Sequence, residues 1–201
     1  MSLERTLVLA STSPYRRALL DRLGLSFECQ GPVCDESLRP ELSPMDFVKS
    51  LAREKALSVK RPNALVIGSD QIVEIDGQIL GKPGDAQRAK RQLQRLAGRS
   101  HRLITAVAVV DTVTQELREA VDIHVLHMHD LSADEIETYV KADEPYFCAG
   151  SYMLEKRGIA LFEKIEADPE TADDTAIIGL PLTKTLNLLR DFGFNPLNQV
   201  P

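Results

Sequence analysis

The sequence predicts an α/β fold in which helices flank a mixed, twisted β-sheet. Two observations carry this prediction. Strand-like and helix-like segments alternate early in the chain, and paired strand-like segments follow later. The chain has 201 residues, of which 43% are hydrophobic, so it can bury a sizeable core. No repeat, low-complexity tract or linker interrupts it, and we expect residues 1–201 to form a single domain.

The first predicted elements are a buried strand and a short helix. Residues 7–10 form an apolar run, which favours a strand. Ser13 is a suitable N-cap and Pro14 suits the first helical position, so we expect a helix over residues 14–23. Gly24 then ends this helix, because glycine readily adopts the left-handed conformation found after a helix C-terminus.

The remaining elements follow from similar signals. Ser43-Pro44 starts a helix as Ser13-Pro14 does, and Asp76-Gly77 suits a two-residue hairpin turn. Ser132 and Glu135 form a capping box, whereas the acidic residues 167–174 are expected to be a solvated loop. In chain order we expect a helix over 44–58, a strand over 64–68 that ends in residues 69–71, a helix over 85–96, long strands over 101–110 and 115–127, a helix over 132–141, a strand over 159–163 and a last helix from Gly179-Leu180-Pro181 to residue 192.

Charge and composition restrict the possible classes of function. The net charge of −6 makes the chain a poor candidate for binding a nucleic-acid backbone, although cations gathered in one cleft would still bind a small anion. No apolar run is long enough to span a bilayer and the first residues lack a signal-peptide layout, so we expect a cytoplasmic protein. Cys29, Cys34 and Cys148 lack zinc-ligand spacing and are expected to be reduced thiols.

Two arginines lie where a helix normally avoids cations. Arg16 and Arg17 fall in the first turn of the predicted helix, beside backbone N–H groups that attract anions. Ser11, Thr12 and Ser13 add hydroxyl donors. The local pattern supports equally a phosphate-binding site and a pair of solvated arginines.

Carboxylates form the second group of candidate residues. Asp70 is expected just past the carboxyl end of a buried strand, where open α/β sheets bind their ligands. The alternative for Asp70 is a turn-forming aspartate. Asp35-Glu36 is a second acidic pair, in a loop that by itself reads as surface.

Lysines and histidines are weaker candidates when each is taken alone. Lys55 lies in the helical run Arg53-Glu54-Lys55, which normally marks a solvated face. Lys82 stands in Gly81-Lys82-Pro83, which lacks the spacing of a Walker phosphate-binding loop. His124, His127 and His129 have only partly alternating strand spacing, and an exposed face shared by His127 and His129 explains it better than a metal site does.

The chain resembles the Maf family of nucleotide pyrophosphatases through an ordered set of motifs that covers nearly its whole length. The matching motifs are Leu9-Ala10-Ser11-Thr12-Ser13-Pro14-Tyr15-Arg16-Arg17, Asp35-Glu36, Ala52-Arg53-Glu54-Lys55-Ala56, Gly68-Ser69-Asp70-Gln71, Gly81-Lys82-Pro83, Glu144-Pro145, Ala149-Gly150 and Gly179-Leu180-Pro181-Leu182. The resemblance implies two lobes around a cleft, similar to inosine triphosphate pyrophosphatases. It also implies hydrolysis between the α- and β-phosphates of a nucleoside triphosphate, with Mg²⁺ or Mn²⁺.

The resemblance also assigns roles to residues. Asp70 matches the family's catalytic aspartate, and the sequence leaves open whether it is a base, a metal ligand or both. Glu36 is expected to share the divalent metal with Asp70, since hard cations prefer oxygen ligands. Substrate binding is expected from Ser13, Arg16, Lys55 and Lys82.

Three further positions resemble those that set base preference in the family. They are Tyr15, Gln71 and Glu155, and together with Phe147-Cys148 they are similar to the YceF-like branch, which acts on 7-methyl-GTP. The 7-methylguanine ring is positively charged, so Tyr15 would attract it by about 0.5–2 kcal/mol of cation–π energy. Glu155 would supply the opposite charge. The acidic residues 168–174 form a longer loop than the family's usual one.

The sequence therefore predicts a 7-methyl-GTP pyrophosphatase that removes modified nucleotides. One alternative is a UTP or dTTP pyrophosphatase of the same family. Another is a nucleotide-sensing cell-division regulator without turnover, against which the intact set of Asp70, Glu36, Lys55 and Lys82 argues. A homodimer is expected from the resemblance alone.

Overall fold

The computed structural model describes residues 5–198, which divide into two compact units. Unit 1 comprises the chain up to Asp70, Thr105–Asp122 and the chain from Asp173 onward. Unit 2 comprises Gln71–Ile104 and Ile123–Ala172. Each unit is therefore assembled from segments that are far apart in the sequence.

The strands form a seven-stranded sheet in the order β2-β1-β3-β5-β6-β7, with β4 paired to β3. The strands are β1 (Thr6–Leu9), β2 (Glu28–Cys29), β3 (Ala64–Ile75), β4 (Gln78–Leu80), β5 (Ser100–Asp111), β6 (Leu117–Met128) and β7 (Phe162–Ala167). Strand β1 pairs in parallel with β2 and β3, whereas β3–β4 and β6–β7 are antiparallel. The predicted mixed α/β sheet is confirmed.

Helices α1, α2 and α5 belong to unit 1, and α3 and α4 belong to unit 2. They are α1 (Pro14–Asp21), α2 (Pro44–Ser58), α3 (Ala86–Leu96), α4 (Ala133–Asp143) and α5 (Leu182–Asp191), with short 3₁₀ helices η1 (Ala149–Ser151), η2 (Arg157–Leu161), η3 (Asp174–Ile178) and η4 (Pro196–Asn198). Ser13, Ser43 and Ser132 cap their helices as predicted, and Ser132 forms the expected capping box with Glu135.

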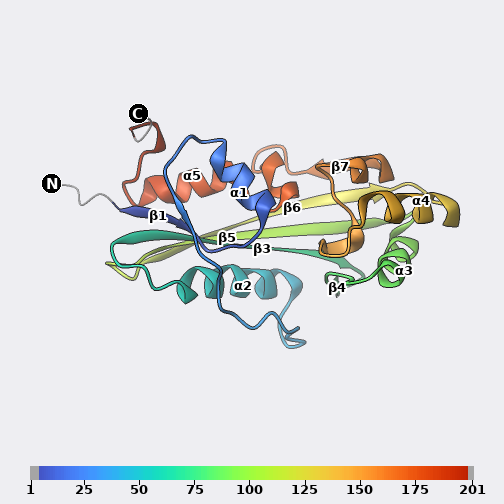
Figure 1. Ribbon diagram of the computed structural model, residues 1–201, viewed down its shortest axis with the longest axis horizontal. Helices are drawn as coiled ribbons and strands as arrows, with labels where there is room; N and C mark the ends of the chain where they lie inside the picture. The colour runs from blue at the N-terminus through green and yellow to red at the C-terminus, as the bar shows by residue number, and fades with distance from the viewer. Residues whose placement is uncertain (1–4, 199–201) are drawn as a thin grey trace. The chain divides into compact units, whose positions relative to one another are not determined.

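The core of unit 1 shows which helices cover which face of the sheet. Leucines from α1 and α5 pack with strand residues such as Leu65 and Ile67, so these helices share one face (Figure 1). Side chains alternate between faces along a strand. Val66, Gly68 and Asp70 therefore point to the other face, which α2 covers.

Helix α2 lies unusually close to β3 at Gly68. A Cβ atom at this position would stand 2.3 Å from the carbonyl oxygen of Ala52 and 2.5 Å from the amide nitrogen of Ala56. Only glycine permits this approach. It brings the side of α2 that carries Lys55 against the strand that carries Asp70.

Unit 2 has a separate buried aromatic group. The Tyr152 and Phe162 rings lie edge to face with centroids 4.9 Å apart, and the His101 ring lies 5.6 Å from Tyr152 and 5.8 Å from Phe162. His101 is 3% exposed, and its Nε2 is 3.0 Å from the Tyr152 hydroxyl. This cluster packs His101 in a mainly apolar environment.

Two sequence expectations about strands are wrong. Strand β3 does not end at residues 69–71 but continues to Ile75, so Asp70 lies inside the strand. The hairpin turn at Asp76-Gly77 is confirmed, with positive φ at both residues. The strand predicted over residues 159–163 is a 3₁₀ helix up to Leu161, and β7 begins only at Phe162.

The acidic stretch over residues 167–174 is also not a uniformly solvated loop. Ala167 ends β7, and Asp173 is only 3% exposed. Asp168 and Glu170 are exposed, as expected. Within residues 5–198, no helix is long and apolar enough to cross a membrane.

Candidate active site

The centre of the candidate site is a buried lysine between two carboxylates. The Nζ atom of Lys55 is 2.6 Å from Asp70 Oδ1 and 2.6 Å from Glu36 Oε1. Lys55 is 4% exposed and Asp70 is 9% exposed, whereas about half of the Glu36 side chain, 49%, is accessible to solvent. The structure thus brings together three residues that the sequence predicted for the site, and leaves one carboxylate open to solvent.

Lys55 remains a cation despite its burial. Burial disfavours the charged ammonium, but attraction to Asp70 and hydrogen bonds to Asp70 and Glu36 outweigh burial and the repulsion from Arg16. The pKa of Lys55 is therefore raised above its usual value of 10.5. The expectation from local sequence that this helix face is solvated is wrong at Lys55.

A neighbouring ion pair holds the loop that carries Glu36. The Arg39 guanidinium donates to both carboxylate oxygens of Glu54 on α2, at 2.5 and 2.8 Å. Its Nη2 also donates to the backbone carbonyl of Asp35 at 3.2 Å. Arg39 therefore links the residue before Glu36 to the helix that carries Lys55, a role that no sequence pattern predicted.

The N-terminus of α1 carries the second part of the candidate site. Ser13 Oγ accepts the backbone N–H of Arg16 at 3.4 Å, and the Arg16 Nε donates to the carbonyl of Gly179 at 2.8 Å. Burial lowers the pKa of the Arg16 guanidinium, and the carboxylates of Asp70 and Glu36 oppose that shift. Arg16 thus lies within electrostatic range of the carboxylates that contact Lys55.

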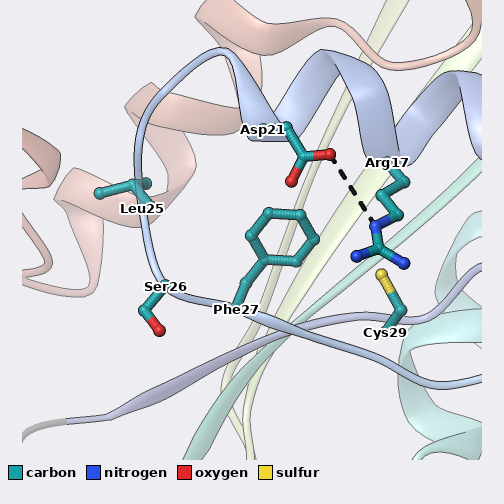
Figure 2. Close-up of a pocket in the computed structure, with 6 residues that line it drawn as sticks. All are labelled: Arg17, Asp21, Leu25, Ser26, Phe27 and Cys29. Atoms are coloured by element: carbon teal, nitrogen blue, oxygen red, sulfur yellow. Dashed lines mark ion pairs between the residues drawn. The ribbon is translucent and has the colours of Figure 1, made fainter.

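The two adjacent arginines have different environments. The Arg17 side chain is 66% exposed and pairs with Asp21 at 3.8 Å. Figure 2 shows this pair on the wall of an open pocket of about 430 Å³, between α1 and the segment leading to β2. The pocket is lined by Arg17, Asp21, Leu25, Ser26, Phe27 and Cys29, of which the sequence named only Arg17 as a candidate for phosphate binding. Of the two arginines, only Arg16 turns toward the carboxylates.

Ser69 links the strand to the loop before α5. Its Oγ lies 2.8 Å from the carbonyl of Ala106 and 2.9 Å from the carbonyl of Gly179. Because side chains alternate along β3, Ser69 faces this loop while Asp70 faces α2. The Gly179 carbonyl therefore contacts both Arg16 and the neighbour of Asp70. No local signal in the sequence predicts that the Gly179 carbonyl contacts these two side chains.

The other predicted site residues lie in both units. Tyr15 is half-buried in the first turn of α1. In unit 2, Gln71 follows Asp70 in β3, and Lys82 lies in the segment after β4. Burial raises the pKa of Glu155, and burial together with Glu155 raises the pKa of Cys148 to about 11. Glu155 and Lys82 both act electrostatically on Cys148, which places them in one region of unit 2.

Carboxylate oxygens are suitable ligands for a divalent cation, and the candidate site contains two carboxylates, Glu36 and Asp70. Among residues 5–198, no group of three or more His, Cys, Asp or Glu residues is placed to hold a metal ion. Mg²⁺ is commonly held by one or two carboxylates, with waters and substrate phosphates as the other ligands. Glu36 and Asp70, which converge on one cation at Lys55 Nζ, fit that requirement.

All three cysteines are free thiols, and Cys29 is exposed. The four histidines contribute to no metal cluster in the described part of the chain.

An α/β sheet with a buried lysine–carboxylate cluster beside an arginine-bearing helix N-terminus is an arrangement suited to a class of proteins that bind phosphate groups. Comparison with known proteins shows to which family the chain belongs. The pattern of the Maf-like protein family matches residues 6–192, which include segments of both units. The chain belongs to the Maf family of nucleotide pyrophosphatases.

The chain is also similar to a named protein of this family. The chain is 44% identical over 186 residues to a 7-methyl-GTP pyrophosphatase of Pseudomonas syringae pv. tomato (strain ATCC BAA-871 / DC3000). The similarity covers 92% of this chain and 95% of that protein. The two proteins are therefore similar over almost their full lengths.

Proposed function

We propose that this protein hydrolyses 7-methyl-GTP to 7-methyl-GMP and pyrophosphate. The observation that carries the chemistry is the convergence of Asp70 and Glu36 on the buried Lys55. The name of the Pseudomonas relative supports the choice of substrate, as does the presence of Tyr15, Gln71 and Glu155 at the positions expected to select the base.

In this proposal the substrate phosphates bind at the N-terminus of α1. Backbone N–H groups at a helix start attract anions. The Arg16 guanidinium, whose Nε is bound to Gly179, presents its remaining N–H groups to the phosphates. The Lys55 cation offsets part of the charge that develops on the departing pyrophosphate.

Asp70 is proposed to orient the attacking water and to accept its proton. Glu36 and Asp70 would hold the divalent cation, which, when bound, polarises the phosphate oxygens and neutralises their charge. About half of the Glu36 side chain, 49%, is accessible to solvent, so a cation from solution would reach this residue. The roles of Lys82, Gln71 and Glu155, the cytoplasmic location and the homodimer stay predictions.

The test of the mechanism is pyrophosphate release by Asp70→Asn. Asparagine keeps the size of the side chain but neither accepts a proton nor carries charge. We expect kcat to fall by about a hundredfold or more in a protein with native circular dichroism. Asp21→Asn, an exposed aspartate in the same unit, serves as the control and is expected to keep wild-type turnover. Near-native turnover by folded Asp70→Asn would contradict the mechanism.

The substrate is tested with a panel of 7-methyl-GTP, GTP, UTP, dTTP and ITP, each with Mg²⁺ and with Mn²⁺. We expect the highest kcat/KM for 7-methyl-GTP. In Glu155→Gln the preference for 7-methyl-GTP over GTP is expected to be smaller, because glutamine lacks the negative charge that attracts the positively charged base. A preference for UTP or dTTP would keep the mechanism and overturn the choice of base. Release from none of them would overturn the proposed activity.

A further inference from the structure

A buried carboxylate outside the predicted site organises the loop before α5. Asp173 is 3% exposed and lies in unit 1. Its Oδ1 accepts the backbone N–H of Thr175 at 3.1 Å and lies 2.5 Å from the Thr175 hydroxyl. Its Oδ2 accepts the backbone N–H groups of Thr183 at 2.6 Å and Lys184 at 3.1 Å. Both oxygens are therefore satisfied by one short stretch of chain.

Asp173 replaces a missing cap on α5. The N-cap of this helix is Pro181, which makes no capping hydrogen bond through its side chain. Thr183 and Lys184 carry free N–H groups of the first turn, and the carboxylate of Asp173 accepts both. The negative charge at the positive end of the helix dipole adds to this stabilisation.

The same carboxylate fixes the chain on both sides of Gly179. The Thr175 hydroxyl, held by Asp173, also lies 3.0 Å from the carbonyl of Leu180 and accepts the N–H of Leu182 at 2.7 Å. The N–H of Asp173 itself donates to Asp122 Oδ2 on β6 at 2.8 Å. The Lys184 ammonium forms an ion pair with the same Asp122 oxygen at 2.9 Å. The loop is thus linked to the sheet through the backbone N–H of Asp173. Contacts of the Thr175 hydroxyl with Leu180 and Leu182 close the loop.

Gly179 lies within this closed loop and presents its carbonyl to the candidate site. It has a φ of 117°, which strongly favours glycine, and ends η3. Its carbonyl accepts Arg16 Nε at 2.8 Å and lies 2.9 Å from Ser69 Oγ. Whatever holds the Gly179 carbonyl therefore also sets the direction of the Arg16 guanidinium.

We propose that Asp173 is a positioning residue for Arg16: it closes the loop that holds the Gly179 carbonyl, and this carbonyl orients the guanidinium toward the substrate phosphates. The inference rests on the proposed function, because it assigns Arg16 a phosphate as its ligand. Asp173 makes no contact with substrate in this arrangement and acts only through the loop.

The experiment is a double-mutant cycle between Asp173→Ala and Arg16→Ala, with kcat and KM measured for 7-methyl-GTP. Misplacing a substrate-orienting group is costly, so we expect Asp173→Ala to lower kcat/KM by about tenfold or more. In the Arg16→Ala background the same change is expected to lower kcat/KM by less than about twofold, since the group it positions is already gone. Equal losses in both backgrounds would overturn the inference.

Two controls separate positioning from loss of stability. Thr185→Val removes the 2.7 Å hydrogen bond from Thr185 Oγ1 to the Pro181 carbonyl, also in the first turn of α5. It is expected to lower the melting temperature while keeping kcat/KM. Asp174→Ala removes the adjacent, exposed carboxylate and is expected to change neither. If Asp173→Ala does not fold, Asp173→Asn takes its place in the cycle. It is expected to have a smaller effect in the same direction.

A binding measurement distinguishes failure of this inference from failure of the proposed activity. The same cycle is run on the affinity for inorganic tripolyphosphate with Mg²⁺, by calorimetry. Coupling in tripolyphosphate affinity without turnover of any nucleotide would support the role of Asp173 and contradict the activity. Turnover without coupling in either measurement would contradict the role of Asp173 alone. A wild-type protein that neither turns over a nucleotide nor binds tripolyphosphate would contradict both.

Discussion

Lys55 is the residue whose environment differs most from what its local sequence indicates. The run Arg53-Glu54-Lys55 reads as a solvated helix face, and Arg53 is indeed exposed. Lys55 is buried because its two partners come from elsewhere in the chain, Glu36 from a loop and Asp70 from β3. Local sequence cannot reveal such a partnership, and only the resemblance to a family pointed to Lys55.

This environment predicts a specific cost for removing the cation. In Lys55→Met the side chain keeps its length, but Asp70 and Glu36 then face each other without an intervening positive charge. We expect the free energy of unfolding at pH 7 to fall by about 3–5 kcal/mol, as for other broken buried ion pairs. Urea denaturation at pH 7 measures the loss.

Lys49→Met is the matched control, because Lys49 lies on the same helix and pairs with Glu119 at 2.9 Å. This pair is more accessible to solvent, so we expect a loss of at most about 1 kcal/mol. Equal losses in the two variants would contradict the expectation that the buried Lys55 ion pairs stabilise the protein more than the Lys49 pair does.

At the scale of elements, capping and turn signals predicted the helices well. Ser13, Ser43 and Ser132 each start a helix where expected, since these signals act over a few adjacent residues. The failed strand over residues 159–163 had only an apolar run to support it. At Gly158 a Cβ would lie 2.4 Å from the carbonyl oxygen of Met153. This close contact within the chain is invisible in the sequence, and the run forms a 3₁₀ helix.

The approach of α2 to β3 gives a prediction at this scale. Gly68→Ala would place a methyl group 2.3 Å from the Ala52 carbonyl, and backbone on both sides prevents an easy adjustment. We expect the free energy of unfolding to fall by about 2–4 kcal/mol, because overpacking forces the helix away from the strand. Thermal unfolding checks the loss of stability.

Pyrophosphate release is expected to fall as well, since the distance from Lys55 to Asp70 depends on the same contact. Gly81→Ala is the control: a Cβ there meets nothing within 4 Å, so stability is expected to stay within about 0.5 kcal/mol of the wild type. A Gly68→Ala protein as stable as Gly81→Ala would contradict the close packing of α2.

At the scale of the whole molecule, each unit has its own buried polar centre. Unit 1 buries the charged Lys55 cluster, whereas unit 2 buries His101 among aromatic rings. Burial, with a smaller contribution from His127, lowers the pKa of His101 from 6.5 to about 4. His101 is therefore neutral in the folded protein at any pH well above 4.

This shift predicts how stability depends on pH. Between pH 6.5 and 4 the unfolded chain protonates His101 while the folded protein does not, so proton uptake favours unfolding. The folded protein is expected to lose about 3 kcal/mol from this group as the pH falls through that range, and nothing from it above pH 6.5.

Other groups titrate in the same range, so the measurement compares variants. Denaturant unfolding of His101→Phe is expected to show a shallower loss of stability between pH 6.5 and 4 than the wild type. His129→Gln removes an exposed histidine and is expected to keep the wild-type slope. Identical slopes for His101→Phe and the wild type would contradict the lowered pKa of His101.

The division of the chain between the units has a consequence for biosynthesis. Unit 2 is complete once Ala172 has been made, whereas unit 1 lacks everything from Asp173 onward until that point. The carbonyl that binds Arg16 is contributed by Gly179, some 163 positions later in the chain. A ribosome-bound intermediate would therefore hold Arg16 without the carbonyl that binds it. The unit that contains Arg16, Lys55 and Asp70 is thus the last to be finished, and no single break in the chain yields unit 1 as one continuous fragment.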